Sequence, residues 1–244
     1  MNNVLRNIGS HMPFDPRTFS LALLWGILPA ILWLFFWLRE DKEHKEPRGL
    51  IVTTFVAGMI AVFIAIPLQK IVASFAYGET TTMALWVFIE EFLKLLVVLF
   101  IVRPTGYIDE PLDYGVYFII AGLGFAGLEN ALFLLKPLSV ADSTVALLTG
   151  NLRFLGSTLL HATSSGIIGI MIGLVFFQNR IIKWFSLFLG LGFAISLHTV
   201  FNLFIIDNNG ETTLQIFGFL WVVTIINILL FEKLRRMSGI KEEQ

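Results

Sequence analysis

The sequence contains no cysteine among its 244 residues. This absence excludes disulfide bonds, thiolate metal ligands and a cysteine nucleophile, and it leaves the redox compartment undetermined. Charged residues are also scarce: they make up 14% of the chain, whereas an average soluble domain has about 25%. The net charge of −1 gives no indication of a nucleic-acid partner. The composition therefore argues against an ordinary soluble domain.

Long apolar runs take the place of charge, because 56% of the residues are hydrophobic. Seven runs come near the roughly 20 residues that a helix needs to cross a bilayer. They cover residues 19–38, 50–69, 83–102, 113–135, 150–177, 183–206 and 214–231. The connections between them are short. We therefore predict an all-α, polytopic membrane helix bundle of about seven transmembrane helices, with one domain over residues 19–231.

The distribution of Lys and Arg predicts how this domain is oriented, since cytoplasmic loops carry the excess. Eleven Lys and Arg residues flank one side of the predicted bundle: Arg39, Lys42, Lys45, Arg48, Arg103, Arg180, Lys183, Lys233, Arg235, Arg236 and Lys241. Only Arg6, Arg17, Lys70 and Lys136 flank the other. Residues 1–18 are thus expected outside and the basic tail 232–244 in the cytoplasm. Within the first segment, residues 9–12 (GSHM) resemble a remnant of an expression vector.

The third run, WVFIEEFLKLLVVLFIV, places Glu90, Glu91 and Lys94 inside an apolar helix. A charged side chain at the middle of a membrane helix costs roughly 2.5–3.5 kcal/mol on insertion scales. Both carboxylates lie three or four residues before the lysine and can reach its ammonium group from one helix face. The triplet alone is compatible with an ion pair that only holds the bundle together, or with a functional site.

Three further runs also carry polar residues. The fourth has Glu129 and Asn130 after a glycine-rich stretch that allows close helix packing. In the fifth, Arg153, Ser157, His161 and Ser165 recur every four residues and form one stripe. The sixth has His198 and Asn202 on a common face. Each of these, taken alone, is also explained by hydrogen bonds between packed helices.

Their depth in the membrane connects these residues. At about 1.5 Å per residue, Glu90 lies about 10 Å below the outer boundary, Glu129 about 9 Å and His161 about 15 Å. On the same scale, His198 lies about 12 Å deep and Asn202 about 6 Å. Four helices thus bring carboxylates, imidazoles and carboxamides to one layer in the outer part of the membrane. This coincidence favours a shared functional site.

Carboxylates beside two histidines suit proton transfer to and from water, or metal binding. A protease in the membrane must hold a water molecule, deprotonate it and stabilise the oxyanion. Glu90 is a candidate general base, and Asn202 is a candidate oxyanion donor. His161 and His198 can bind a divalent metal together with a Glu, or can hydrogen-bond the water without metal. The sequence leaves both alternatives open.

Other protease mechanisms and other functions fit the sequence less well. No H-E-x-x-H motif is present, and no predicted span carries an Asp in its middle, because Asp113 lies at a helix end. A Ser–His pair drawn from residues 163–165 would leave the three Glu residues without roles. A proton- or cation-coupled transporter is the main rival, although such proteins more often show inverted repeats. A non-catalytic scaffold that binds membrane helices through its glycine-rich spans is the second rival.

The ordered motifs resemble the PrsW family of intramembrane proteases and, more distantly, the CAAX-prenyl-protease-like glutamate proteases of membranes. Four features carry the resemblance: E-E-x-x-K at 90–94, Asp113-Tyr-Gly leading into G-F-x-x-x-E-N at 124–130, Arg153 with His161, and H-x-x-x-N at 198–202. Tyr114 departs from the family pattern, which often has Gly directly after the Asp. It does not touch the catalytic candidates.

The resemblance implies a multi-pass protease of the bacterial cytoplasmic membrane. By analogy, Glu90 activates water while Glu91 and Lys94 set its charge environment. Asn130 and Arg153 are expected in supporting roles. His161 and His198 are expected to bind metal or to orient the water, and Glu129 is expected as a third metal ligand or as a partner that supports the ligands. The family is classed as metalloproteases and the distant relatives as metal-free, so one divalent ion such as zinc, or none, is expected. The implied substrate is a single-pass membrane protein, such as the anti-sigma factor assigned to a founding member.

Overall fold

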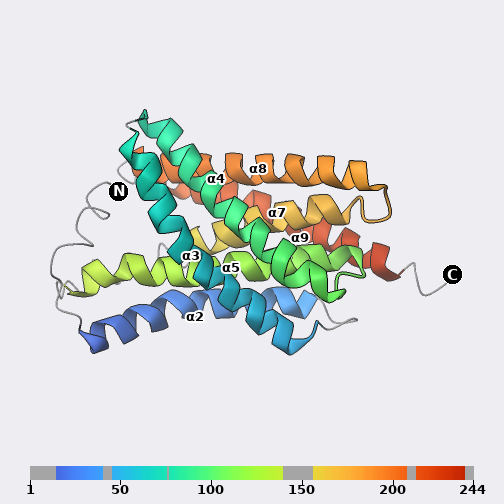
Figure 1. The fold of residues 1–244 in the computed structure, drawn as a ribbon, viewed down its shortest axis with the longest axis horizontal. Helices are drawn as coiled ribbons and strands as arrows, with labels where there is room; N and C mark the ends of the chain where they lie inside the picture. Colours follow the sequence, from blue (N-terminus) through green and yellow to red (C-terminus); the bar gives the residue numbers. More distant parts are fainter. Residues whose placement is uncertain (1–14, 41–45, 76, 140–155, 208–212, 240–244) are drawn as a thin grey trace.

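The described part of the chain is helical, and no β-strand occurs in it. The computed structural model describes residues 15–40, 46–75, 77–139, 156–207 and 213–239. Within these ranges lie seven α-helices, shown in Figure 1: α2 (Pro16–Glu40), α3 (Arg48–Ser74), α4 (Glu79–Val97), α5 (Pro111–Ser139), α7 (Thr158–Gly173), α8 (Arg180–Asp207) and α9 (Thr213–Gly239). This arrangement confirms the predicted all-α fold with about seven helices.

Five of these helices are long and apolar enough to cross a membrane, namely α2, α3, α5, α8 and α9. A helix suits this environment because it satisfies every backbone polar group within one segment. The α4 helix differs because its 19 residues include Glu90, Glu91 and Lys94. Its helical path continues through a π-helical turn at Val98–Val102 and a 3-10 turn at Arg103–Thr105.

The α2 helix begins at a capping aspartate. Asp15 Oδ1 accepts the backbone N–H of Arg17, and Asp15 Oδ2 accepts both the N–H and the hydroxyl of Thr18. These bonds satisfy N–H groups that the first turn leaves without helical partners. The hydrogen bond from the Thr18 hydroxyl, with those from the two N–H groups, lowers the pKa of Asp15 below its usual value. The helix therefore starts three residues before the predicted boundary at residue 19.

The fifth predicted span is longer than the helix that the structure describes. Its first six residues, 150–155, lie outside the described part. The α7 helix has 16 residues and ends at Gly173, not at residue 177. Beyond that point the chain turns, and the N–H of Phe176 donates to the carbonyl of Gly173 at 3.0 Å. Apolar residues continue through the turn, so hydropathy alone could not mark the end of the helix.

The α5 helix forms the centre of the bundle. Of its most apolar 18-residue window 78% is buried, against 28% for α2, α3 and α9. It packs against α2, α3 and α7. Glycines allow these close approaches, because a Cβ atom at Gly124 would collide with the Phe55 carbonyl oxygen of α3. The residues before Asn130 on α5 are therefore held rigidly against three neighbours.

The α4, α8 and α9 helices complete the bundle beside α5 and α7. The α4 helix packs against α3 and α8, while α7 packs between α5 and α8 and also contacts α9. Figure 1 shows the beginning of α2 and the end of α9 at opposite ends of the bundle. The chain therefore runs the length of the bundle an odd number of times between these two points. The packing brings α4, α5, α7 and α8 together, and these four carry the polar residues singled out in the sequence.

Candidate active site

The α4 helix forms the first wall of a buried polar cluster. We define this polar cluster by six residues: Glu90, Glu91, Lys94, Glu129, His161 and His198. Glu90, Glu91 and Lys94 are all buried. Lys94 Nζ donates to Glu91 Oε1 at 2.8 Å across one helical turn. Of the two adjacent carboxylates, Glu91 thus forms the ion pair. Glu90 Oε1 instead accepts a hydrogen bond at 2.8 Å from the Gln69 amide of α3.

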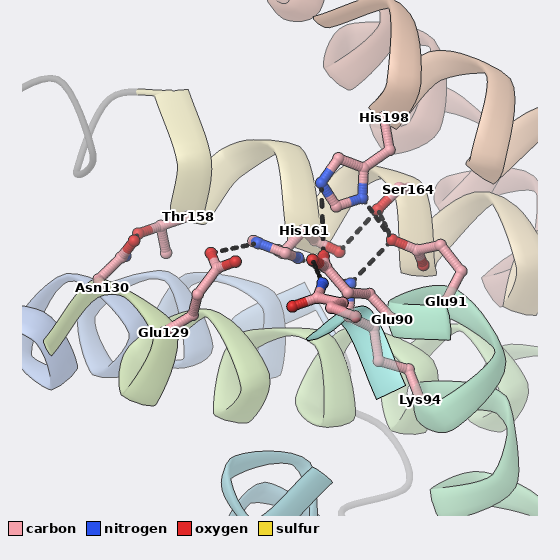
Figure 2. Close-up of polar contacts among 10 residues, drawn as sticks. Glu90, Glu91, Lys94, Glu129, Asn130, Thr158, His161, Ser164 and His198 are labelled. Carbon is pink, nitrogen blue, oxygen red and sulfur yellow. Dashed lines mark hydrogen bonds and ion pairs between the residues drawn. The ribbon is translucent and has the colours of Figure 1, made fainter. Parts of the chain in front are cut away.

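His161, on α7, connects α4 with α5. Its Nδ1 atom lies 2.7 Å from Lys94 Nζ, and its Nε2 atom lies 3.2 Å from Glu129 Oε2. Figure 2 shows Glu129 on one side of the His161 ring and the α4 residues on the other. Because a lysine ammonium can only donate, Nδ1 is the acceptor and Nε2 carries the ring proton. The Nε2 proton then points towards Glu129.

His198, on α8, carries its ring proton on the other nitrogen, Nδ1. Its Nδ1 atom lies 2.7 Å from Glu91 Oε1, and its Nε2 atom lies 3.7 Å from Glu90 Oε2. An ionised carboxylate can only accept, so Nδ1 carries the proton and Nε2 presents a lone pair. The two imidazole rings meet edge to face with centroids 4.8 Å apart. The cluster therefore presents one imidazole N–H and one imidazole lone pair.

Glu91 serves as the anchor of this arrangement. One oxygen, Oε1, accepts hydrogen bonds from Lys94, from His198 and, at 3.1 Å, from the Ser164 hydroxyl. These contacts come from three helices, as Figure 2 shows. A carboxylate that holds the N–H of a histidine fixes both the tautomer and the orientation of the ring. Glu91 therefore positions His198 and leaves Glu90 as the carboxylate next to the free lone pair.

Within and beside the polar cluster, three buried oxygen atoms have no hydrogen-bond partner in the described part of the chain: Glu90 Oε2, Glu91 Oε2 and Ser165 Oγ. Unpaired buried polar atoms are rare in folded proteins and commonly indicate a water or an ion. Glu90 Oε2 faces His198 Nε2, so both atoms offer lone pairs to the same space. This space suits a species that can donate protons or accept electron pairs.

The donor atoms also fit a divalent metal. Glu90, His161 and His198 each offer one ligand atom, and these atoms lie within 4.8 Å of one another. A His₂Glu set is one that catalytic zinc sites use, with a further position left for water. This group has Glu90 where the sequence led us to expect Glu129. Glu129 is the neighbour of the group through its contact with His161.

The other predicted residues lie around the cluster. Asn130 is buried on α5 and donates to the Thr158 hydroxyl of α7 at 2.9 Å. Asn202 is partly exposed, one turn beyond His198 on α8, and makes no hydrogen bond to the cluster in the described part of the chain. Arg153 lies outside the described residues.

Two contributing residues were not among the predicted candidates. Gln69 supports Glu90, and its own carbonyl accepts the indole N–H of Trp86 at 2.9 Å. It stands at the end of an apolar run, where a polar residue is ordinary. Ser164 supports Glu91 and follows His161 by three residues. Its place on the polar face of His161 was the one available signal.

Comparison with known proteins agrees with the resemblance indicated by the sequence motifs. The family model described as "PrsW family intramembrane metalloprotease" matches residues 46–230. A "Protease PrsW" of Geobacillus kaustophilus is 31% identical over 185 residues, which cover 72% of this chain and 76% of that protein. A "Protease PrsW" of Halalkalibacterium halodurans is 26% identical over 229 residues, covering 89% of this chain and 100% of the relative.

A third relative, "Protease PrsW" of Bacillus subtilis, is 31% identical over 113 residues, covering 45% of this chain and 52% of the relative. No solved structure matches the chain. The family match includes every described residue of the polar cluster. The resemblance inferred from the four motifs is therefore confirmed, and the chain is a membrane protease that belongs to the PrsW family of intramembrane metalloproteases.

Proposed function

We propose that this protein is an endopeptidase that hydrolyses a peptide bond of a membrane-protein substrate with water activated by Glu90. The observation that carries the proposal is the pair of facing acceptors, Glu90 Oε2 and His198 Nε2, 3.7 Å apart in a buried site. A water molecule held by both would give its proton to Glu90 as its oxygen attacks the scissile carbonyl, and Glu90 would return that proton to the leaving nitrogen as the C–N bond breaks. Without a water molecule between them, the lone pairs of Glu90 Oε2 and His198 Nε2 would repel each other.

The remaining residues then have distinct roles. Glu91 holds His198 in the tautomer whose Nε2 accepts a hydrogen bond from the water. Lys94 neutralises Glu91 and keeps the Nε2 proton of His161 on the side of Glu129. That N–H is a donor for the oxyanion that forms when water attacks. We assign to Asn202, one turn away on α8, a contact with the substrate outside the cluster.

A divalent metal such as zinc is compatible with the same donor atoms, and we propose that Glu90, His161 and His198 hold it. When bound, the ion would supply Lewis-acid activation of water and of the scissile carbonyl. The Nε2 proton of His161 would then have to leave, and Glu129 is the nearest carboxylate to receive it. Glu129 is therefore available as the base that removes the Nε2 proton of His161 when the metal binds.

We expect the purified protein to hold about one equivalent of zinc, because the cluster has one three-ligand group. Chelation should lower cleavage by at least about tenfold, and added zinc should restore it. Elemental analysis of the wild type and of His198→Ala checks the binding, and Ser196→Ala on the exposed face of α8 is the control. Full activity in protein stripped of metal would contradict the metal proposal, and Glu90 would remain the base.

The open side of the cluster indicates where the substrate enters. The side chain of Glu129 is 19% exposed, whereas those of His161 and His198 are 1% and 2% exposed. With the orientation predicted from Lys and Arg, this side faces the outer leaflet. We propose a single-pass membrane protein as the substrate, with an anti-sigma factor as the candidate that the family resemblance suggests, and the bacterial cytoplasmic membrane as the location.

Cleavage of a single-pass model substrate is expected on its extracytoplasmic flank. The reason is that Glu90 and Glu129 lie on the outer side of the bilayer's middle, because they are about 10 and 9 Å deep in a hydrocarbon core of about 30 Å. Mass spectrometry of the fragments locates the cut, with the His198→Ala protein as the blank. A cut on the cytoplasmic flank would show that the orientation or the depth is wrong.

A further inference from the structure

A second site lies at the other end of the four helices that build the polar cluster. A cavity of about 270 Å³ opens between the end of the α4 path, the start of α5, the end of α7 and the start of α8. Arg103, Arg180 and Lys183 line it, together with Tyr114 and Trp184. Arg180 and His198 are separated by 18 positions on α8, which corresponds to about 27 Å along the helix. The cavity is therefore separate from the candidate active site.

The three basic residues of this cavity have no carboxylate in direct contact within the part of the chain that the structure describes. Lys183 lies over the Phe176 ring at 5.0 Å. The α8 helix begins at Arg180, so the positive end of its dipole adds to the same charge. Like charges that converge without a counter-ion favour an anionic ligand.

The shape of the cavity indicates what kind of anion it takes. Its inner wall is apolar, since Ile172 and Leu187 are buried at 5% and 4% exposure. Its rim has Trp184, which is 42% exposed, and Tyr114. Trp and Tyr are enriched where a membrane protein meets the lipid headgroups. A ligand with a phosphate and an attached apolar chain matches both the basic rim and the apolar wall.

We propose that this cavity binds the phosphate headgroup of an anionic phospholipid. Basic pockets between transmembrane helices on the cytoplasmic side are suited to such headgroups. The predicted orientation places Arg103, Arg180 and Lys183 on that side. A bound lipid would join the ends of α4, α5, α7 and α8 opposite to the polar cluster. It would therefore stabilise the arrangement of the four helices without touching the catalytic residues.

The test measures binding of phosphatidylglycerol to the full-length protein in detergent, by native mass spectrometry and by the shift in melting temperature. Phosphatidylcholine and inorganic phosphate are the comparison ligands. The test variant is Arg103→Gln/Arg180→Gln/Lys183→Gln. The matched control, Arg39→Gln/Arg48→Gln/Lys233→Gln, removes three exposed charges from the same end of the bundle but outside the cavity.

We expect phosphatidylglycerol to bind and raise the melting temperature, and the test variant to bind at least about tenfold more weakly. The control should bind as the wild type does. Arg103→Lys/Arg180→Lys keeps the charge and should retain binding, which separates charge from folding. Equal binding by the test variant and the control would overturn the proposal. Equal protection by inorganic phosphate would also overturn it, because the lipid would then not be the ligand.

Discussion

The variant Glu90→Gln is expected to lose peptide-bond hydrolysis by about 10²–10⁴-fold, the usual contribution of a positioned general base. The carboxamide has nearly the shape of the carboxylate, and its oxygen can still accept the hydrogen bond from Gln69. It cannot take a proton from water. The loss should therefore be in the cleavage rate, measured with purified protein and a membrane substrate in proteoliposomes, while the melting temperature stays near that of the wild type.

A matched control is available on the same helix. Glu79 lies exposed in the first turn of α4, away from the polar cluster. Glu79→Gln removes the same charge and should leave cleavage unchanged. If Glu90→Gln were to cleave as fast as this control, Glu90 would not be the base, whatever the role of the histidines.

The largest effect on stability is expected from Lys94→Met. Lys94 is fully buried and compensates the buried carboxylate of Glu91. Removing one partner of a buried ion pair leaves an uncompensated charge and typically costs about 3–5 kcal/mol. The free energy of unfolding should fall by this order, as measured by titration with a denaturing detergent. Cleavage should fall too, because His161 loses the donor that fixes its tautomer.

A second substitution separates charge from shape. In Lys94→Met/Glu91→Gln the buried carboxylate is also gone, so much of the lost stability should return. Cleavage should not return, because His198 would lose the ionised acceptor at its Nδ1 atom. A double variant no more stable than Lys94→Met alone would show that the lysine acts through packing and not through its charge.

Much of the fold could be predicted because a bilayer imposes simple rules. Long apolar runs gave the helices, and the spacing of Glu91 and Lys94 gave their contact across one turn. Depth calculated from span boundaries brought Glu90, His161 and His198 to one level. The structure groups these three residues within the range of a single metal ion.

Other features of the site depend on rotation about the helix axes, which depth does not determine. Glu129 and Glu90 lie at similar depths, yet Glu90 is the carboxylate grouped with both imidazoles. The choice depends on how α4 and α5 are turned, and glycine contacts such as that of Gly124 with Phe55 set this rotation. The support from Gln69 was likewise unpredictable, because it comes from another helix, α3, whose rotation depth does not determine either.

The central claim is that residues on separate helices act as one catalytic unit. Initial cleavage rates of Glu90→Gln, His198→Ala and the double variant in proteoliposomes test it most directly. Residues that act as a unit show strongly non-additive losses. We expect each single variant to lose about 10²-fold or more, and the double variant to be no slower than the slower single variant. Losses that multiply in the double variant, or wild-type rates in either single variant, would contradict a shared catalytic cluster.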